Sequence, residues 1–252
     1  MSFPYISALS FDAVTNQYAA TRALHVGTKG MTEEGSEYRL CKAGAAITNP
    51  LAAKINAYRY LAAVSGDVAE TTAVAIAAGD RTVTITDATN ARAAEYYKDG
   101  YFTIPDSGTY DVFHHIWKSD AEVSDTYKLY LSDPMIYAYA AGLTVAVYPN
   151  PWKNVKNAGA YSQGYETFIC CIERPVTSGY YFWGKVKGPH WAWITGTWPG
   201  AAQNDRDVCF WIDGTIKMQD EGINTSAISL QRAGYALFSG NYGDALIMLQ
   251  IE

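Results

Sequence analysis

The sequence predicts a mainly β protein, built from short-stranded sandwich or barrel subdomains with one or two short helices and an extended N-terminal arm. Composition is the first reason: the 252 residues include 20 tyrosines and 21 glycines, and only 17% are charged. Tyrosine favours strands and glycine favours turns, whereas globular chains average about 25% charged residues. The second reason is spacing, because short apolar runs recur every 8–15 residues or so, as in sandwiches and barrels.

The first element is the expected arm, residues 1–36. This stretch is polar, rich in glycine and threonine, and has little periodicity before a strand begins at residues 38–41. Such a segment is an extended arm or a loose hairpin that becomes ordered when it docks on a partner. Deleting residues 1–20 is therefore expected to weaken binding to that partner and to leave the fold intact.

The strongest helix signal covers residues 49–62. Asn49 can cap the helix, Pro50 suits its first position, and Leu51 and Ile55 fall at helical spacing. A short helix near 50–55 followed by a strand over 58–61 fits the same residues. A second short helix is predicted over 88–97, before the turn pair Asp99-Gly100.

Strands dominate the remainder of the chain. Residues 82–86 (TVTIT) alternate apolar and hydroxyl side chains with period two, which is typical of a half-buried strand. Other strands are predicted over 101–104, 110–116, 127–131, 143–148, 167–172, 179–186, 191–195, 208–212 and 245–251. A shift in composition near residue 150 predicts three parts: the arm 1–36, a β-rich subdomain 37–150 with the short helices, and a small β-barrel or sandwich 151–252.

Charge and hydropathy narrow the range of partners. The net charge is −6 and the isoelectric point is near 5.2, so no basic surface for nucleic acid or anionic lipid is expected. No apolar run reaches the ~20 residues that cross a bilayer. The first residues, MSFPY, lack the charged and apolar regions of a signal peptide. We expect a soluble protein made in a cytoplasm.

Metal-binding and redox patterns are weak. The four cysteines have no CxxC spacing, and adjacent Cys170 and Cys171 would point to opposite faces of a strand, so buried free thiols are expected. His114 and His115 would likewise face opposite sides, one packed and one exposed. A loose calcium site at Asp205 and Asp207, or at Asp87, is an alternative that lacks the ligand pattern of an EF-hand loop.

Catalytic patterns are equally sparse. The sequence contains no GxSxG, GxGxxG or GxxxxGK[ST] motif. Acidic residues are dense between 205 and 221, and we interpret them as solvated turn residues; an acid pair of a hydrolase is the alternative. We therefore expect no enzyme, with no catalytic, cofactor-binding or metal-binding residues and no cofactor.

An aromatic stretch is the sharpest local feature. Residues 180–183 (YYFW) are followed by Trp191, Trp193 and Trp198, and Trp191 and Trp193 would share one face of a strand. Three interpretations remain open for these rings: the core of a small barrel, a protein interface, or a platform on which sugar rings stack.

An ordered series of motifs resembles one protein family over most of residues 24–252. The strand at 82–86 is followed by YKDGYF at 97–102, and later tracts continue the order: residues 110–119, LYLSDP at 129–134, VYPNPW at 147–152, GYYFWGKVKGP at 179–189, GYAL at 234–237 and LIMLQI at 246–251. These tracts resemble the capsid decoration (cement) proteins of tailed phages. Residues 204–208 (NDRDV) depart from the family's usual glycine-aspartate turn.

The resemblance implies a virion structural protein rather than an enzyme. Such a protein binds the major capsid protein on the capsid exterior, often as a homotrimer, and stabilises the shell. Many copies on a symmetric lattice gain avidity, so each contact can be modest. A host-adhesion or glycan-binding module on the virion is the alternative, suggested by Trp191, Trp193 and the tyrosine content.

Overall fold

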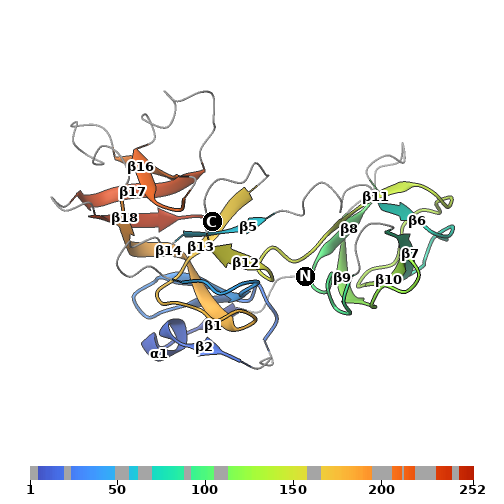
Figure 1. Ribbon diagram of the computed structural model, residues 1–252, viewed down its shortest axis with the longest axis horizontal. Coiled ribbons are helices and arrows are strands. Elements are labelled where there is room, and N and C mark those ends of the chain that lie inside the picture. Colours follow the sequence, from blue (N-terminus) through green and yellow to red (C-terminus); the bar gives the residue numbers. More distant parts are fainter. Residues whose placement is uncertain are drawn as a thin grey trace. The chain divides into compact units, whose positions relative to one another are not determined.

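The computed structural model confirms a mainly β protein. It describes residues 5–19, 24–48, 57–61, 70–87, 92–104, 113–157, 166–194, 206–211, 213–218, 231–239 and 244–252, and the statements below concern these residues. Their strands form one large sheet and one closed six-stranded barrel (Figure 1). No described helix is long and apolar enough to cross a membrane.

The chain divides into two compact units, and the second is inserted into the first. One unit combines Met1–Ala62 with Trp152–Glu252, and the other is Ala63–Pro151. The predicted boundary near 150 matches the point where the chain leaves the inserted unit. The predicted boundary at 36 is wrong, because residues 29–42 form one hairpin and residues 57–61 pair with strands beyond 152. A composition shift cannot reveal pairing across an insertion.

The sheet of the first unit is organised around one long strand, β14 (Tyr181–Trp193). The N-terminal half of β14 pairs with β4 (Glu37–Lys42), and its C-terminal half pairs with β18 (Asp244–Gln250). Two separate strands, 179–186 and 191–195, were expected, since Gly188-Pro189 is typical of a break. Gly188 has a φ of +116° and its backbone approaches Ser36, so β14 continues through the pair while it changes partner.

The remaining strands extend this sheet on both sides of β14. The main path runs β1-β3-β4-β14-β18-β17-β15-β16, in which all but the β1–β3 pair are antiparallel. β13 and β2 also pair with β14, and β5 lies between β12 and β13. Their bounds are β1 (Tyr5–Ser7), β2 (Gln17–Tyr18), β3 (Lys29–Met31), β5 (Ala57–Leu61), β12 (Val155–Asn157), β13 (Glu166–Cys171), β15 (Asp207–Phe210), β16 (Ile216–Met218) and β17 (Arg232–Ser239).

Strand β5 replaces the C-terminal part of the expected helix 49–62. Its backbone pairs with β12 and β13, and its residues AYRYL include two tyrosines, which favour strands. The helix prediction is thus wrong over 57–61, and the alternative strand over 58–61 is confirmed. Residues 49–56 lie outside the described part of the chain.

The N-terminal segment belongs to the body of the first unit, so the prediction of an extended arm is wrong for its described residues. β1 joins the sheet, and the short helix α1 (Phe11–Thr15) is capped by Ser10, whose Oγ accepts from the backbone nitrogen of Ala13 at 3.2 Å. Leu9 and Val14 are buried in one cluster with Leu40 and Trp183. Removing residues 1–20 would expose this cluster, contrary to the expectation of an intact fold.

Leu9 provides a direct test of this packing. Its side chain is 8% exposed and packs over Gly30 so closely that a Cβ there would overlap with it. Leu9→Ala is expected to lower the free energy of unfolding by about 2 kcal/mol, because it leaves a cavity. Phe11→Ala is the matched control: Phe11 is 74% exposed, so a change below about 0.5 kcal/mol is expected. Urea unfolding measures both, and equal losses would contradict the packing described.

The second unit is the closed barrel. Its order is β10-β7-β6-β11-β8-β9, with every neighbouring pair antiparallel, which leaves no free sheet edge. The core is filled by large apolar side chains such as Phe102, Ile116 and Leu129. The bounds are β6 (Glu70–Thr72), β7 (Thr82–Thr86), β8 (Tyr101–Thr103), β9 (His114–Ser119), β10 (Thr126–Leu131) and β11 (Thr144–Tyr148).

The helix expected over 88–97 is absent from its described part, residues 92–97, in which residues 94–97 form turns. Glu95 adopts a φ of +65°, a conformation that ends any right-handed helix. Its backbone N–H instead donates to the carbonyl of Ser119 at 2.8 Å, at the end of β9. Residues 88–91 lie outside the described part.

Candidate functional site

A band of six ring-bearing side chains lies on the outside of the barrel. The strands β11, β8, β9 and β10 lie side by side in the barrel. Each contributes at least one residue that points outward, while the residues before and after it in the strand face the core. We call this set the aromatic band: Tyr101, Phe113, His115, Trp117, Tyr130 and Tyr148. Phe113 immediately precedes β9; it is 67% exposed, Trp117 is 52% exposed, and Tyr148 is 41% exposed.

The rings of the aromatic band contact one another in pairs. Ring centroids are 6.3 Å apart for Phe113 and Tyr148, 6.1 Å for Tyr101 and His115, and 5.8 Å for Trp117 and Tyr130. All three pairs are tilted or edge-on, as isolated aromatic pairs prefer. These contacts hold large side chains in place on the surface, so little side-chain entropy remains to be lost when a partner covers them.

Polar groups lie directly beside the rings. The Tyr130 hydroxyl donates to Oδ2 of Asp120 at 2.8 Å, and Nζ of Lys118 lies 3.1 Å from Oδ1 of Asp120 and 4.6 Å from the Tyr130 ring centroid. The bond from Tyr130 holds the pKa of Asp120 below its ordinary value. Nδ1 of His115 lies 2.8 Å from the hydroxyl of Ser132. The band therefore offers both apolar area and hydrogen-bonding groups.

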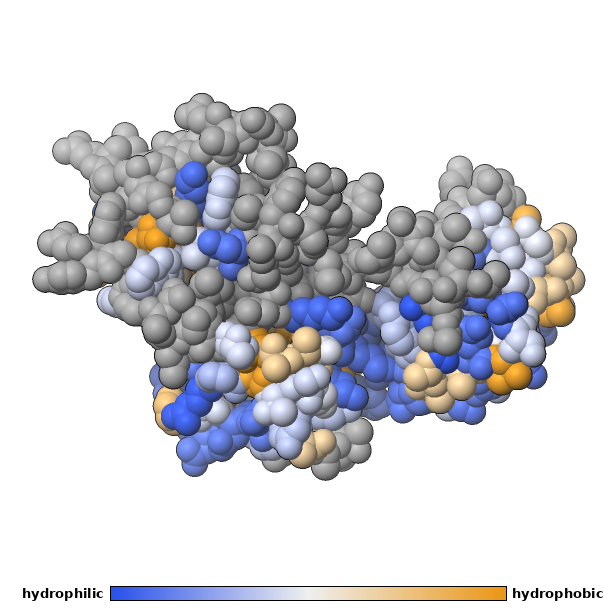
Figure 2. Space-filling model, viewed as in Figure 1, coloured by the Kyte–Doolittle hydropathy of each residue, from blue (hydrophilic) through white to orange (hydrophobic). Residues whose placement is uncertain are grey.

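The aromatic band was not identified from the sequence. Figure 2 shows several separate hydrophobic patches among hydrophilic residues on the face in view. The prediction that His114 and His115 face opposite sides of a strand is confirmed, since His114 is buried and His115 is half-exposed. The strand itself, β9, lies at His114–Ser119 rather than over the predicted 110–116. The signal that was missed is the period-two spacing of Phe113, His115 and Trp117, which places all three rings on one face.

Trp191 and Trp193 also face away from the core. Trp191 is 46% exposed and Trp193 is half-buried, while the residues between and beside them, His190, Ala192 and Ile194, are buried. The shared face is confirmed, and the barrel-core interpretation of these two rings is wrong. Core packing does hold for part of the earlier aromatic stretch, because Phe182 and Trp183 are buried. Trp198 lies outside the described residues.

These tryptophans belong to an apolar surface on the first unit. In the register of β14, β18 and β17, Trp191 lies beside Leu246, which lies beside Phe238, and Pro189, Met248 and Tyr235 form the next row. Phe238 is 60% exposed. We call these six residues with Trp193 the sheet face.

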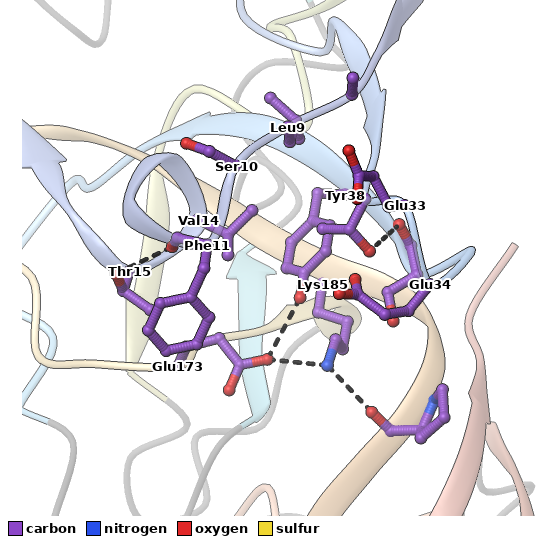
Figure 3. Close-up of a pocket in the computed structure, with 14 residues that line it drawn as sticks. Leu9, Ser10, Phe11, Val14, Thr15, Glu33, Glu34, Tyr38, Glu173 and Lys185 are labelled. Carbon is purple, nitrogen blue, oxygen red and sulfur yellow. Dashed lines mark hydrogen bonds and ion pairs between the residues drawn. The ribbon is translucent and has the colours of Figure 1, made fainter.

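A cavity of about 640 Å³ opens on the first unit (Figure 3). Its wall combines helix α1, the turn at 32–36 and β14, and at its centre Nζ of Lys185 lies 2.9 Å from Oε1 of Glu173. The hydroxyl of Tyr38 donates to the same oxygen at 3.5 Å. Glu33 and Glu34 line the same space. We call this space the acidic cavity, because it holds three carboxylates and one ammonium group.

Burial and neighbouring charges act in opposite directions on the pKa values of Glu173 and His190. Burial acts to raise the pKa of Glu173, but His190, once acid has protonated it, and Lys185 outweigh burial and hold that pKa below its ordinary value. Burial lowers the pKa of His190 to about 4, although its Nδ1 lies 4.0 Å from Glu173. His190 is therefore neutral at physiological pH, and Lys185 carries the positive charge beside Glu173.

The barrel interior contains a second polar cluster. Oε1 of Glu70 accepts from the Tyr97 hydroxyl at 3.0 Å, and Oε2 accepts a short bond from Tyr127. Asp87 is 3% exposed, and its Oδ2 lies 3.4 Å from Nε of Arg92. Asp87 thus faces a guanidinium group, which is unlike the all-oxygen environment of a calcium site.

The other expected site residues are dispersed. All four cysteines are buried and free, and Cys170 and Cys171 lie in different core clusters, which confirms their opposite faces. Asp207 pairs with Arg232 at 2.8 Å, and residues 204, 205, 220 and 221 lie outside the described part. Within the described ranges, no three His, Cys, Asp or Glu side chains are grouped to hold a metal ion.

No protein-family model matches the sequence, and no curated protein matches it.

Proposed function

We propose that the protein is a non-catalytic virion structural protein that binds the outside of a tailed-phage capsid and stabilises the shell. The observation that carries this proposal is the aromatic band, a rigid surface of rings and polar groups on four adjacent barrel strands. The phage identity of the partner, the major capsid protein, comes from the resemblance of the motifs at 82–86, 97–102 and 179–189 to decoration proteins.

The aromatic band suits a contact between two separately folded proteins. Interfaces that form after folding are enriched in Tyr, Trp and Phe and carry many hydrogen bonds. Phe113 and Trp117 provide exposed anchor rings, and Lys118, Asp120 and Ser132 provide polar groups beside them. A contact of modest strength is sufficient, because copies arranged on a symmetric capsid add avidity.

The sheet face suits a contact between copies of the chain. It combines Trp191, Leu246, Met248 and Phe238, so it is more aliphatic than the aromatic band. Contacts between identical subunits are on average more apolar than contacts between separate proteins. We assign this surface to the homotrimer that decoration proteins often form on the capsid, after synthesis in the host cytoplasm.

A host-adhesion or glycan-binding module is the second candidate function. The exposure of Trp191 favours it, since an exposed indole ring can stack on the apolar face of a sugar. A glycan array distinguishes the two functions. Binding to defined glycans that is lost in Trp191→Ala would support adhesion, and an array without signal would remove this candidate.

The capsid proposal is tested by adding the purified protein to capsids that lack it. We expect saturable attachment and a higher temperature of capsid rupture, because ligands that bind only the intact shell stabilise it by mass action. Scanning calorimetry of the capsids with and without the protein measures the rupture temperature. Saturation without any shift would contradict the stabilising role, and failure to attach would contradict the proposal itself.

A further inference from the structure

The acidic cavity of the first unit has a floor formed by a fixed ion pair. Lys185 is 8% exposed, and its Nζ donates to Oε1 of Glu173 and to the carbonyl oxygen of Pro189, both at 2.9 Å. The same ammonium group lies 5.5 Å from the Tyr38 ring centroid. An ammonium group has three N–H donors; two of them bond to these oxygens, and the Tyr38 ring lies beside the group. Lys185 therefore positions Glu173 rather than offering a site for an anion.

The carboxylates of the acidic cavity exceed its positive charge. Three carboxylates, Glu33, Glu34 and Glu173, face one ammonium group, so two negative charges remain uncompensated within the lining. In Figure 3, Oε1 of Glu173 is the oxygen joined to Lys185 and Tyr38, and the second oxygen of the carboxylate points away from both. A backbone hydrogen bond, a bond from Thr32 and the charge of Lys185 hold the pKa of Glu34 below its ordinary value, so it is ionised at neutral pH.

An aromatic ring completes the wall. Phe11 lines the cavity, and 74% of its surface is exposed, so its ring is accessible to a ligand. Figure 3 draws its ring beside Glu173, on the side of Lys185 opposite to Glu34. The cavity thus presents a carboxylate at its floor, two carboxylates at its rim and a ring that a flat cation can cover.

We propose that the acidic cavity binds an arginine side chain presented by a partner protein. A guanidinium group is planar, carries five N–H donors that match carboxylate oxygens, and stacks on aromatic rings. These properties correspond to Glu173 and Glu34 as acceptors and to Phe11 as the stacking surface. A lysine ammonium group could also lie over the ring, but it is a compact point charge and lacks the planar pair of N–H donors that matches carboxylate oxygens. The inference concerns only the first unit, so its test is independent of the role proposed for the aromatic band on the barrel.

The test titrates the ¹⁵N-labelled full-length protein with the peptide acetyl-Gly-Arg-Gly-amide and follows its amide resonances. Its uncharged counterpart carries citrulline, which keeps the shape of arginine and removes the charge. We expect saturable shifts at the amides of Glu34, Tyr38 and Glu173 with the arginine peptide, and binding at least tenfold weaker with citrulline. Shifts of equal size with both peptides, or no saturable shifts with either, would overturn the proposal.

Variants locate the binding in the cavity. The double variant Glu33→Gln with Glu34→Gln removes two exposed charges without touching the Lys185 pair, and it should weaken arginine binding about tenfold. Glu95→Gln with Asp133→Asn removes two charges from the barrel unit and controls for net charge; it should bind as the unchanged protein does. Phe11→Ala should weaken binding severalfold. Equal binding by the Glu33/Glu34 variant and the control variant would contradict the assigned site.

Discussion

Replacing Phe113 and Trp117 together by alanine is expected to weaken attachment to capsids by at least about 30-fold. Both rings are exposed, at 67% and 52%, and each is held by a neighbouring ring, Tyr148 or Tyr130. Loss of a single anchor residue at an interface costs about 2 kcal/mol, which corresponds to about 30-fold in affinity. Co-sedimentation of the labelled variant with capsids over a range of concentrations measures the loss.

The matched control removes two other exposed apolar side chains of the same barrel. Ile136 and Tyr137 are 53% and 42% exposed and lie between β10 and β11 in sequence, outside the aromatic band. Their double alanine variant should attach within about threefold of the unchanged protein, as expected for residues outside the energetic centre of an interface. If the control variant loses attachment and the Phe113/Trp117 variant keeps it, the aromatic band is not the contact.

The barrel unit is expected to lose about 3 kcal/mol of stability as the pH rises from below 4.5 to well above 7. The cause is Glu70, which is 2% exposed inside the barrel. Burial raises the pKa of Glu70 from 4.5 to about 7, against the opposing bonds from Tyr127 and Tyr97, and the charge of nearby Asp87 raises it further. Each pKa unit corresponds to about 1.4 kcal/mol.

The sign of this effect follows from proton binding. Between pH 4.5 and 7 the folded barrel keeps a proton on Glu70 that the unfolded chain releases, so the folded state binds more protons. The contribution of the protonated carboxyl is therefore complete below pH 4.5 and is lost as the pH rises through 7. A carboxyl whose pKa is lower in the folded state than in the unfolded state makes stability rise with pH instead. A loss of barrel stability with rising pH therefore points to the buried carboxyl of Glu70.

Glu70→Gln tests this assignment, because glutamine is neutral at every pH. Protection of the Val83 and Leu129 amides against hydrogen exchange, corrected for intrinsic rates, reports the stability of the barrel without unfolding the rest. The unchanged protein and Glu70→Gln differ in the free energy of exchange protection, and this difference should change by about 3 kcal/mol between pH 4.5 and a pH well above 7. Glu95→Gln, a half-exposed carboxylate in the same unit, should leave the profile unchanged. Parallel profiles for the unchanged protein and Glu70→Gln would contradict the account.

Local patterns in the sequence were sufficient to predict most barrel strands. The TVTIT run at 82–86 coincides with β7, and Tyr101–Thr103 forms β8, because period-two alternation depends only on which residues face the core. The burial of the four cysteines could be predicted for a different reason, because a free cysteine without a metal-binding or redox pattern usually behaves as a buried apolar residue. β17 was not predicted as a strand, since its residues RAGYALFS do not alternate and a register shift falls between Ala236 and Phe238.

Long-range features could not be predicted. Nothing local in residues 5–19 shows that Leu9 and Val14 pack against Trp183, and this pairing turns the expected arm into part of the core. The aromatic band has the same origin, because Tyr148, Tyr101 and Phe113 meet only when β11, β8 and β9 become neighbours in the closed barrel. The acidic cavity likewise joins the turn at 32–36 with Glu173 and Lys185.

We propose that this protein binds a capsid through the outer surface of β8, β9, β10 and β11, where the aromatic band lies. A cryo-electron map of capsids saturated with the protein tests it most directly. The account predicts density for the barrel on the capsid exterior, with Phe113, Trp117 and Tyr130 against the major capsid protein. A map in which the protein is attached while these three rings face solvent would contradict the claim.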